Sequence, residues 1–285
     1  GKTLTALEPR TEINATNTPG EANSIFRITQ TGSYYLSGNN QQNGTRSAIE
    51  IAASNVTIDL SGFTLFSFIT NDGPVNNIVV RNGFVEASFI SLLAGGADPA
   101  DGCVIEHITF SICTTQAIRV GDGCTVRNVR LVAPAGNFGG SIRMGNFATL
   151  TDVTVENRAS GSAPCIDVGT HAMMERVLTR GGSTGIEAGN YATLRSCVVA
   201  NSLSQTRPAI SVGLGSTLTD CISSDNQSAG FSMGNNSRLT GCIASGNLGG
   251  GFVNANANSV SMINCTADTN SNEANIRLGG FAMIS

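Results

Sequence analysis

A short phrase recurs along this chain at intervals of 20 to 24 residues. It consists of an apolar residue, a variable residue, an apolar or small residue and then usually glycine. Its copies begin at Ile118, Ile142, Ile166, Ile186, Ile210, Phe231, Phe252 and Ile276. A repeat this short, without helical periodicity, predicts a solenoid whose turns stack on each other. Stacking would bring equivalent residues of successive repeats side by side, and this decides where a site can form.

A second strand follows the glycine turn of each repeat. Residues 148–155, for example, alternate apolar and polar side chains, which is the period of a half-buried strand. Short strands joined in parallel should wind right-handed. We therefore predict an all-β chain, a right-handed parallel β-helix of about ten rungs over residues 47–285. Residues 1–46 do not fit the repeat and are expected to form an irregular N-terminal cap or lead-in.

Composition limits the functional classes. The 285 residues carry a formal net charge of only -4, which argues against nucleic-acid binding driven by overall charge. No apolar run approaches the roughly 18 to 20 residues that a membrane span requires. We also find no Walker loop, no HExxH sequence and no nucleophile elbow.

Two further groups of side chains raise the question of metals. Four of the eight cysteines occupy one slot of successive repeats: Cys197, Cys221, Cys242 and Cys265. Earlier repeats hold valine there, so we expect buried free thiols and no thiolate zinc site. Asp98, Asp101 and Glu106 lie on or near one loop and could hold Ca²⁺ through oxygen ligands, although a solvated loop is the preferred interpretation. No metal ligand and no cofactor is predicted otherwise.

Residues 28–39, 52–63 and 210–221 resemble rungs of bacterial right-handed parallel β-helix repeat proteins of the pectate-lyase-like superfamily, most of which are uncharacterised. The resemblance covers most of the chain and implies the same fold and an extracellular or cell-surface location. It implies no activity, because this fold serves lyases, hydrolases, epimerases and adhesins. The local active-site motifs of pectate lyases and uronate epimerases are absent, so no catalytic residue is carried over.

The variable residue of the repeated phrase should form an outward ladder. Its members in four consecutive rungs are Arg119, Arg143, Asp167 and Glu187. One interpretation is a surface salt bridge between Arg143 and Asp167, which contributes little stability in water. The alternative is a groove that binds an acidic or hydroxylated chain. Arg119 beside Arg143 has no opposite charge within the ladder and favours the groove.

A second ladder lies in the glycine turn, four residues after the first, and places Phe147, His171 and Tyr191 in consecutive rungs. Aromatic stacking that stiffens the turns is the preferred interpretation. The first alternative is a platform for sugars. The second is proton transfer in a polysaccharide lyase, with Arg143 neutralising a uronate carboxylate and His171 or Tyr191 acting as the base.

A third ladder should point outward from the last strand of each rung. Leu178, Val198, Ile222 and Ile243 would form an apolar stripe on four rungs. Such a stripe usually marks an interface, and we expect a homo-oligomer, for example a trimer. The alternatives are a covering loop or a shifted register that buries the stripe.

These observations lead to one preferred function and two alternatives. The preferred function is an extracellular or surface protein that binds polysaccharide along one face or serves as an assembled scaffold, without strong evidence for catalysis. Short connections argue against a deep substrate cleft. The first alternative is a polysaccharide lyase or related carbohydrate-active enzyme. The second is a self-assembling fibre subunit stacked end to end, suggested by an apolar C-terminal segment without an evident cap.

Overall fold

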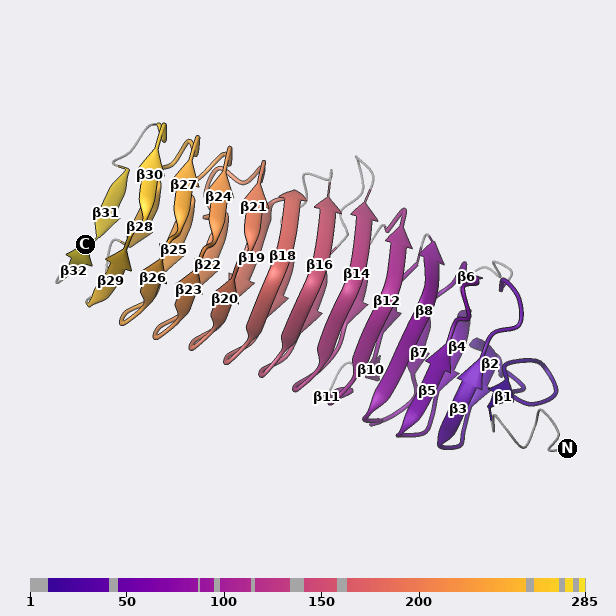
Figure 1. Cartoon of the computed structure of the whole chain (residues 1–285). Helices are drawn as coiled ribbons and strands as arrows, with labels where there is room; N and C mark the ends of the chain where they lie inside the picture. The colour runs from indigo at the N-terminus through magenta and orange to yellow at the C-terminus, as the bar shows by residue number, and fades with distance from the viewer. Residues whose placement is uncertain are drawn as a thin grey trace, which may run out of the picture.

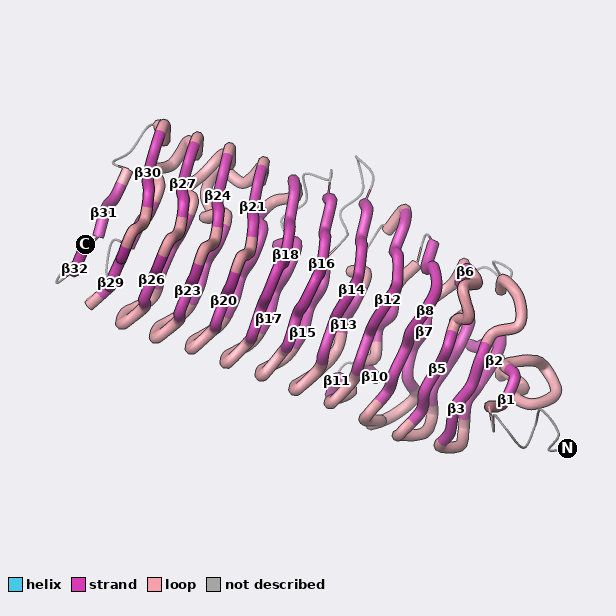
Figure 2. Tube along the Cα trace, in the orientation of Figure 1, coloured by secondary structure: helices cyan, strands magenta, loops and turns pink. Residues whose placement is uncertain are grey.

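The computed structural model describes residues 10–40, 46–86, 88–94, 98–113, 116–133, 141–157, 163–254, 259–271, 275–278 and 282–284. These residues form strands and loops (Figure 2). They wind as a right-handed parallel β-helix of about ten turns, a rod with the first and last described strands at opposite ends (Figure 1). The predicted fold is therefore confirmed. Within the described ranges, no helix is long and apolar enough to cross a membrane.

One side of the rod, face 1, is a single parallel sheet of twelve strands. It contains the repeated phrase and pairs each copy with the next in register. Its strands are β2 (Ser24–Ile28), β4 (Ser47–Ile51), β7 (Ile69–Asn71), β9 (Ile90–Ser91), β13 (Ile118–Arg119), β15 (Ile142–Met144), β17 (Pro164–Val168), β19 (Thr184–Ala188), β22 (Ile210–Val212), β25 (Phe231–Met233), β28 (Phe252–Asn254) and β31 (Ile276–Leu278).

The second large sheet has eighteen strands. A bend that runs along the length of the rod divides it into two faces, face 2 and face 3. Five long strands span both faces: β8 (Ile78–Glu86), β12 (Val104–Ser111), β14 (Thr125–Ala133), β16 (Thr149–Asn157) and β18 (Met173–Gly181). Face 2 also contains β1 (Thr11–Glu12), β3 (Gly32–Tyr35), β5 (Val56–Asp59), β20 (Thr193–Arg195), β23 (Thr217–Thr219), β26 (Arg238–Thr240), β29 (Val260–Ile263) and β32 (Ala282–Ile284). Face 3 also contains β6 (Thr64–Leu65), β21 (Val198–Ala200), β24 (Ile222–Ser224), β27 (Ile243–Ser245) and β30 (Thr266–Asp268). A separate antiparallel pair joins β10 (Leu93–Ala94) to β11 (Asp98–Pro99).

The bend between faces 2 and 3 follows from one left-handed residue per rung. In β14, Arg127 and Asn128 are both exposed, while Val126 and Val129 on either side are buried. Asn128 has φ 51°, outside the β region, so the chain turns there and the next side chain still points inward. The same slot holds Asn82, His107, Asp152, Arg176, Ser196, Asp220, Gly241 and Asn264 in other rungs, all with positive φ.

The core contains the predicted cysteine ladder. Cys197, Cys221 and Cys242 are buried, Cys265 is half-buried, and all four are free thiols. Hydrogen bonding to Cys197, followed by burial, raises the pKa of Cys221 to about 12. This thiol is therefore neutral at physiological pH and suits an apolar slot.

The lead-in segment joins the sheets before residue 47. Strand β2 pairs in register with β4 on face 1, and β3 pairs with β5 on face 2. Residues 24–35 therefore already stack on the first full coil. The domain boundary at residue 46 stays a prediction, and residues 1–9 and 41–45 lie outside the described part of the chain.

Candidate functional site

The corner between faces 1 and 2 brings the predicted aromatic ladder together. It is the lower edge of the rod in Figure 1, where β16 and β18 begin. The backbone N–H groups of Phe147, His171 and Tyr191 each donate to a carbonyl in the next turn, at 2.8 Å in all three cases. This regular backbone pairing holds the three side chains in register.

The three rings form one exposed stack. Ring centroids of Phe147 and His171 lie 5.0 Å apart, and those of His171 and Tyr191 lie 5.1 Å apart. Phe147 remains 59% exposed and Tyr191 50% exposed. The stack ends on Gly215, where an added Cβ would lie 2.7 Å from the Tyr191 ring. At Gly123, the other end, an added Cβ would meet no atom within 4 Å.

These aromatic residues occupy a backbone position that suits glycine. Phe147, His171 and Tyr191 have φ values of 56° to 57°, and the equivalent Gly123 and Gly215 have φ 62° and 66°. The left-handed conformation costs about 1–2 kcal/mol for a residue with a side chain. Ring stacking returns about 0.5–1.5 kcal/mol per pair. Glycine would therefore form this turn as well as the aromatic residues do, because the stacking energy of the rings does not exceed the cost of their backbone strain.

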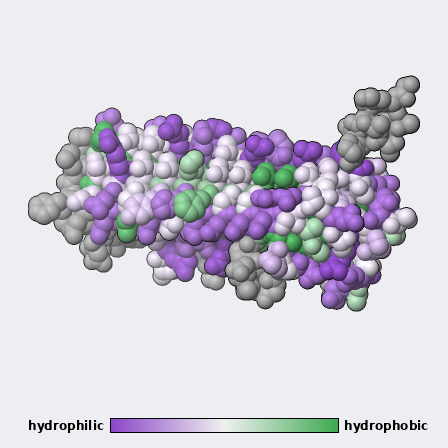
Figure 3. All heavy atoms as spheres, turned by 90° about the horizontal axis from the view of Figure 1, so that it is seen from below, coloured by the Kyte–Doolittle hydropathy of each residue, from purple (hydrophilic) through white to green (hydrophobic). Residues whose placement is uncertain are grey.

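Exposed apolar side chains concentrate at this corner. The described residues include nine large hydrophobic side chains that are exposed, and four of them lie here: Phe147, Met173, Tyr191 and Leu214. Figure 3 shows this edge from below, with small apolar patches set among hydrophilic atoms. We call Phe147, His171, Met173 and Tyr191 the corner platform. An exposed apolar patch of this kind usually marks an interaction site.

A depression of about 200 Å³ adjoins the corner platform on face 2. Hydroxyl groups and charges line it together with Met173, and its lining is Thr149, Leu150, Thr151, Met173, Met174, Glu175, Thr193 and Arg195. Glu175 is paired with Arg176. Arg195 makes no ion pair within the described residues, so its guanidinium is open to a ligand.

The outward ladder of face 1 has the predicted register, but most of its charges are compensated. Arg143 pairs with Asp167 at 3.3 Å, and Glu187 pairs with Arg207 at 2.8 Å. Arg119 stands next to Arg143 in the sheet and has no ion pair among the residues described. The ladder is thus a row of surface ion pairs with one uncompensated cation at its N-terminal end.

The catalytic roles of Arg143, His171 and Tyr191 stay predictions. The guanidinium of Arg143 already faces a carboxylate, which weakens its capacity to neutralise a uronate. His171 Nδ1 lies 3.3 Å from Thr170 Oγ1, a neighbour in its own turn. No contact within the described residues links the imidazole to Asp167 or Glu187, so the structure gives no relay that would activate a base.

The apolar stripe on face 3 also has the predicted register. Leu178, Val198, Ile222 and Ile243 pair in sequence along adjacent strands. Ile243 is 39% exposed and the other three are half-buried. The stripe points outward as expected, while its role as an interface and the oligomeric state stay predictions.

The carboxylates proposed for Ca²⁺ have other partners. Arg127 Nη2 lies 2.5 Å from Glu106 Oε2, and Asp101 Oδ1 accepts the backbone N–H of Asp122 at 2.7 Å. The side chain of Asp98 is outside the described part. The described residues contain no group of three or more His, Cys, Asp or Glu side chains that could hold a metal. The calcium site is untested and stays a prediction.

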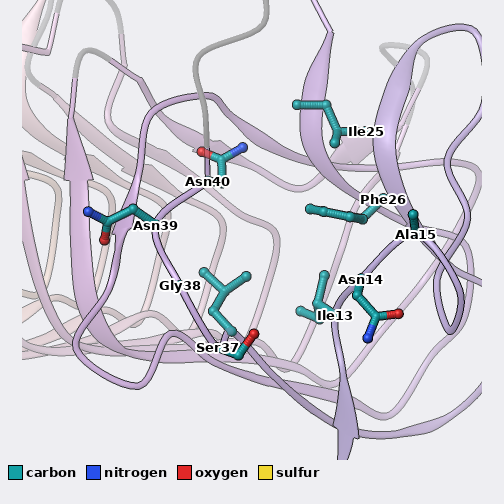
Figure 4. A pocket seen from close by; sticks show the side chains of 10 residues that line it. Ile13, Asn14, Ala15, Ile25, Phe26, Ser37, Gly38, Asn39 and Asn40 are labelled. Atoms are coloured by element: carbon teal, nitrogen blue, oxygen red, sulfur yellow. The ribbon is translucent and has the colours of Figure 1, made fainter.

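A further cavity of about 370 Å³ lies at the N-terminal end of the rod (Figure 4). Ile13, Ile25, Phe26 and Leu36 supply apolar walls. The buried Nδ2 of Asn40 faces it and has no hydrogen-bond partner within the described residues. None of the site residues predicted from the sequence lines this cavity.

Sequence reasoning missed several of these residues. Met173 follows His171 by two residues, so strand alternation could have placed it on the outer side of face 2. Arg207 comes from residues 201–209, a connection outside the repeat, and no spacing signal marks it as the partner of Glu187. Phe68 and Phe89 stack on face 1 at 4.9 Å, although their segments lie before the regular copies of the phrase.

Comparison with solved structures identifies proteins with this architecture. The Agl-KA catalytic domain is 15% identical with a TM-score of 0.52, and the match covers 92% of this chain and 60% of that one. The A-module of the Azotobacter vinelandii mannuronan C-5 epimerase AlgE6 is 13% identical with a TM-score of 0.47, covering 97% and 87%. Bacteriophage CBA120 tailspike protein 3 is 10% identical with a TM-score of 0.41, covering 97% and 54%.

These similarities concern the fold. This chain spans less than two thirds of the Agl-KA catalytic domain. No protein-family model matches the sequence, and no curated protein matches it. The strand topology and the similarity to the Agl-KA catalytic domain show the right-handed parallel β-helix fold.

Proposed function

We propose that this protein binds a polysaccharide chain across the corner platform and the adjoining depression on face 2. The observation that carries the proposal is the exposed stack of Phe147, His171 and Tyr191 in left-handed turns that glycine would fill with less strain. Left-handed residues also form the bend between faces 2 and 3, so it is the exposure of the stacked rings that favours a ligand here.

The shape and chemistry of the surface favour a polymer of sugars. The three stacked rings form an open strip about 10 Å long, from the two centroid distances of 5.0 and 5.1 Å. Because the rings stack face to face, a sugar would bury its C–H groups against their exposed edges and the outer face of Phe147. Nearby threonine hydroxyls and Arg195 can bond its oxygen atoms. An open strip suits an extended chain, whereas a small ligand requires a more enclosed cavity.

Binding is better supported than catalysis. The lyase predicted from the sequence relies on Arg143 and on a base at His171 or Tyr191, but Arg143 is paired with Asp167 and the His171 ring contacts only Thr170 among polar groups of the described residues. Action outside the cell or at its surface is part of this proposal, because polymers of this kind are met there. The scaffold and fibre alternatives and the oligomeric state stay predictions.

The test replaces the rings by a residue that tolerates the left-handed turn. Asparagine occupies the same slot at Asn236 with φ 59°, so a Phe147→Asn, Tyr191→Asn double variant should keep the backbone. We expect its affinity for the preferred polysaccharide to fall at least tenfold, measured by affinity electrophoresis on a panel of neutral and acidic polymers. Its thermal stability should stay the same or rise, because backbone strain is relieved.

The matched control is Phe84→Thr. Phe84 is 48% exposed on face 3, and its neighbours in the same column are Thr64 and Thr109. This variant also removes an exposed ring but should retain all binding. Unchanged affinity in the double variant together with a lower melting temperature would assign the rings to turn stiffening and refute the proposal.

A further inference from the structure

Face 1 contains a cavity of about 380 Å³ that the corner platform does not use. Its lining combines one ring, two neutral polar groups and one cation: Phe89, Ser91, Gln116 and Arg119. The Phe89 ring is held by stacking on Phe68, with centroids 4.9 Å apart and ring planes within 6° of parallel. The aromatic wall of the cavity is therefore fixed in orientation.

The cation in this cavity lacks a counter-charge. In the register of the sheet, Arg119 lies beside Ser91 of one neighbouring strand and beside Arg143 of the other. Arg143 is neutralised by Asp167 in the next rung, whereas no carboxylate lies within ion-pair distance of Arg119 in the described part of the chain. A half-buried guanidinium with free donors beside a second guanidinium is suited to a carboxylate or sulfate, which it can bind with two parallel hydrogen bonds.

We infer that this cavity binds an acidic sugar unit, carboxylated or sulfated, as an anion site separate from the corner platform. Arg119 takes the anionic group, Phe89 covers the apolar face of the ring, and Gln116 and Ser91 bond its hydroxyls. Arg119 lies four residues before the turn at Gly123, one rung from Phe147, so the two sites are within about 20 Å. One oligosaccharide can reach both.

Titration calorimetry on Arg119→Gln tests the anion site. The probes are an oligogalacturonate (carboxylated), a heparin-derived oligosaccharide (sulfated) and a neutral cello-oligosaccharide, at low salt and at 0.5 M NaCl. We expect at least a tenfold loss of affinity for one of the two acidic probes, with a weaker salt dependence and unchanged affinity for the neutral probe. The acidic probe that responds identifies the anionic group.

The control is Arg238→Gln, which removes an exposed arginine on face 2 that has no ion pair among the described residues. It changes net charge equally and should leave all three affinities unchanged. If both arginine variants lost the same affinity for the acidic probes, the effect would come from the net charge of the protein, and the inference would be overturned. Acidic probes that bind the wild type and Arg119→Gln equally, or that bind neither, would also overturn it.

The anion site and the proposed function fail separately. If the Phe147→Asn, Tyr191→Asn variant binds as well as wild type while Arg119→Gln loses acidic probes, the anion site stands and the corner platform does not. The reverse pattern supports the corner platform alone.

Discussion

At the corner between faces 3 and 1, a ladder of asparagines stacks inside the solenoid; at the corner between faces 1 and 2, a ladder of rings stacks outside it. Asn226 and Asn247 are fully buried. Phe147 and Tyr191 are 59% and 50% exposed. Both ladders repeat one kind of side chain from rung to rung, so periodicity alone does not separate them.

The hydrogen bonds do separate the two ladders. Asn247 Nδ2 donates to the Ser223 carbonyl at 3.0 Å and to Asn270 Oδ1 at 2.9 Å. Its Oδ1 accepts from Asn226 Nδ2 at 2.7 Å, and Asn226 Nδ2 also reaches Ser223 Oγ at 3.0 Å. The asparagines thus satisfy polar groups that the corner would otherwise bury unpaired. Within the described part of the chain, the rings of Phe147 and Tyr191 make no hydrogen bond to a polar group of the turn.

This contrast gives a criterion for repeat proteins. A ladder that satisfies buried polar groups is explained by the fold. A ladder that is exposed, strained and dispensable for its turn requires another explanation, which here is the binding of a ligand. The two ladders should therefore respond in opposite ways when they are disrupted, one in stability and the other in binding.

The largest effect is expected from Asn247→Ala. It would leave the Ser223 carbonyl and the amides of Asn226 and Asn270 short of partners inside the corner, and each unsatisfied buried group costs about 1–3 kcal/mol. We expect a destabilisation of about 3 kcal/mol in thermal or urea unfolding, without loss of polysaccharide affinity at temperatures where the variant is folded.

Gln227→Ala is the matched control for that variant. Gln227 is exposed beside Asn226, and its side chain makes no hydrogen bond to other described residues. Its replacement should change stability by less than about 0.5 kcal/mol. A similar loss in both variants would show that the asparagine ladder is no more structural than any surface amide.

The second effect concerns the end of the ring stack. An added Cβ at Gly215 would lie 2.7 Å from the Tyr191 ring, so Gly215→Ala must both adopt φ 66° with a side chain and displace that ring. We expect a destabilisation of about 2 kcal/mol. Because Tyr191 would be tilted out of the stack, polysaccharide affinity should fall as well.

Gly123→Ala isolates the ring contact. Gly123 has φ 62° and no atom within 4 Å of an added Cβ, so it shares the backbone strain without the clash. It should cost about 1 kcal/mol and leave binding unchanged. If Gly215→Ala and Gly123→Ala were destabilised equally in thermal unfolding, the packing of Tyr191 on Gly215 would make no contribution to stability.

Much of this geometry follows from the sequence. The repeat spacing fixes the register, so the columns that hold Arg143 beside Asp167 and His171 beside Tyr191 can be read from 20- to 24-residue intervals. Stacking at about 4.8 Å between strands then dictates which side chains meet. Strand alternation adds the inward or outward direction of each column.

The partners that come from outside the repeat could not be predicted. Arg207 reaches Glu187 from a connection of irregular length, and such a segment has no register to extrapolate. The cavity beside Arg119 needs Phe89 and Gln116, whose positions depend on loop geometry before the regular rungs begin. The left-handed φ of Phe147 could not be predicted either, because bulky residues rarely adopt this conformation and only the alignment of Phe147 with Gly123 indicates it.

The smallest expected effect would extend the ring stack by one rung. Gly123→Tyr places a fourth ring beside Phe147, where a Cβ meets open space. Stacking of about 0.5–1.5 kcal/mol should roughly offset the left-handed strain, so the melting temperature should change little. A longer strip contacts one more sugar, and we expect a threefold to tenfold higher affinity for long polysaccharide chains, with no gain for a disaccharide.

The control is Gly62→Tyr, which supplies a ring on another corner and should bind as wild type. Gly62 has φ 82° and no atom near an added Cβ. If the affinity for the polymer does not change with the fourth ring, or rises equally in both tyrosine variants, the sugars do not bind along the stack. The corner platform would then be no better a candidate for the binding site than the rest of the surface.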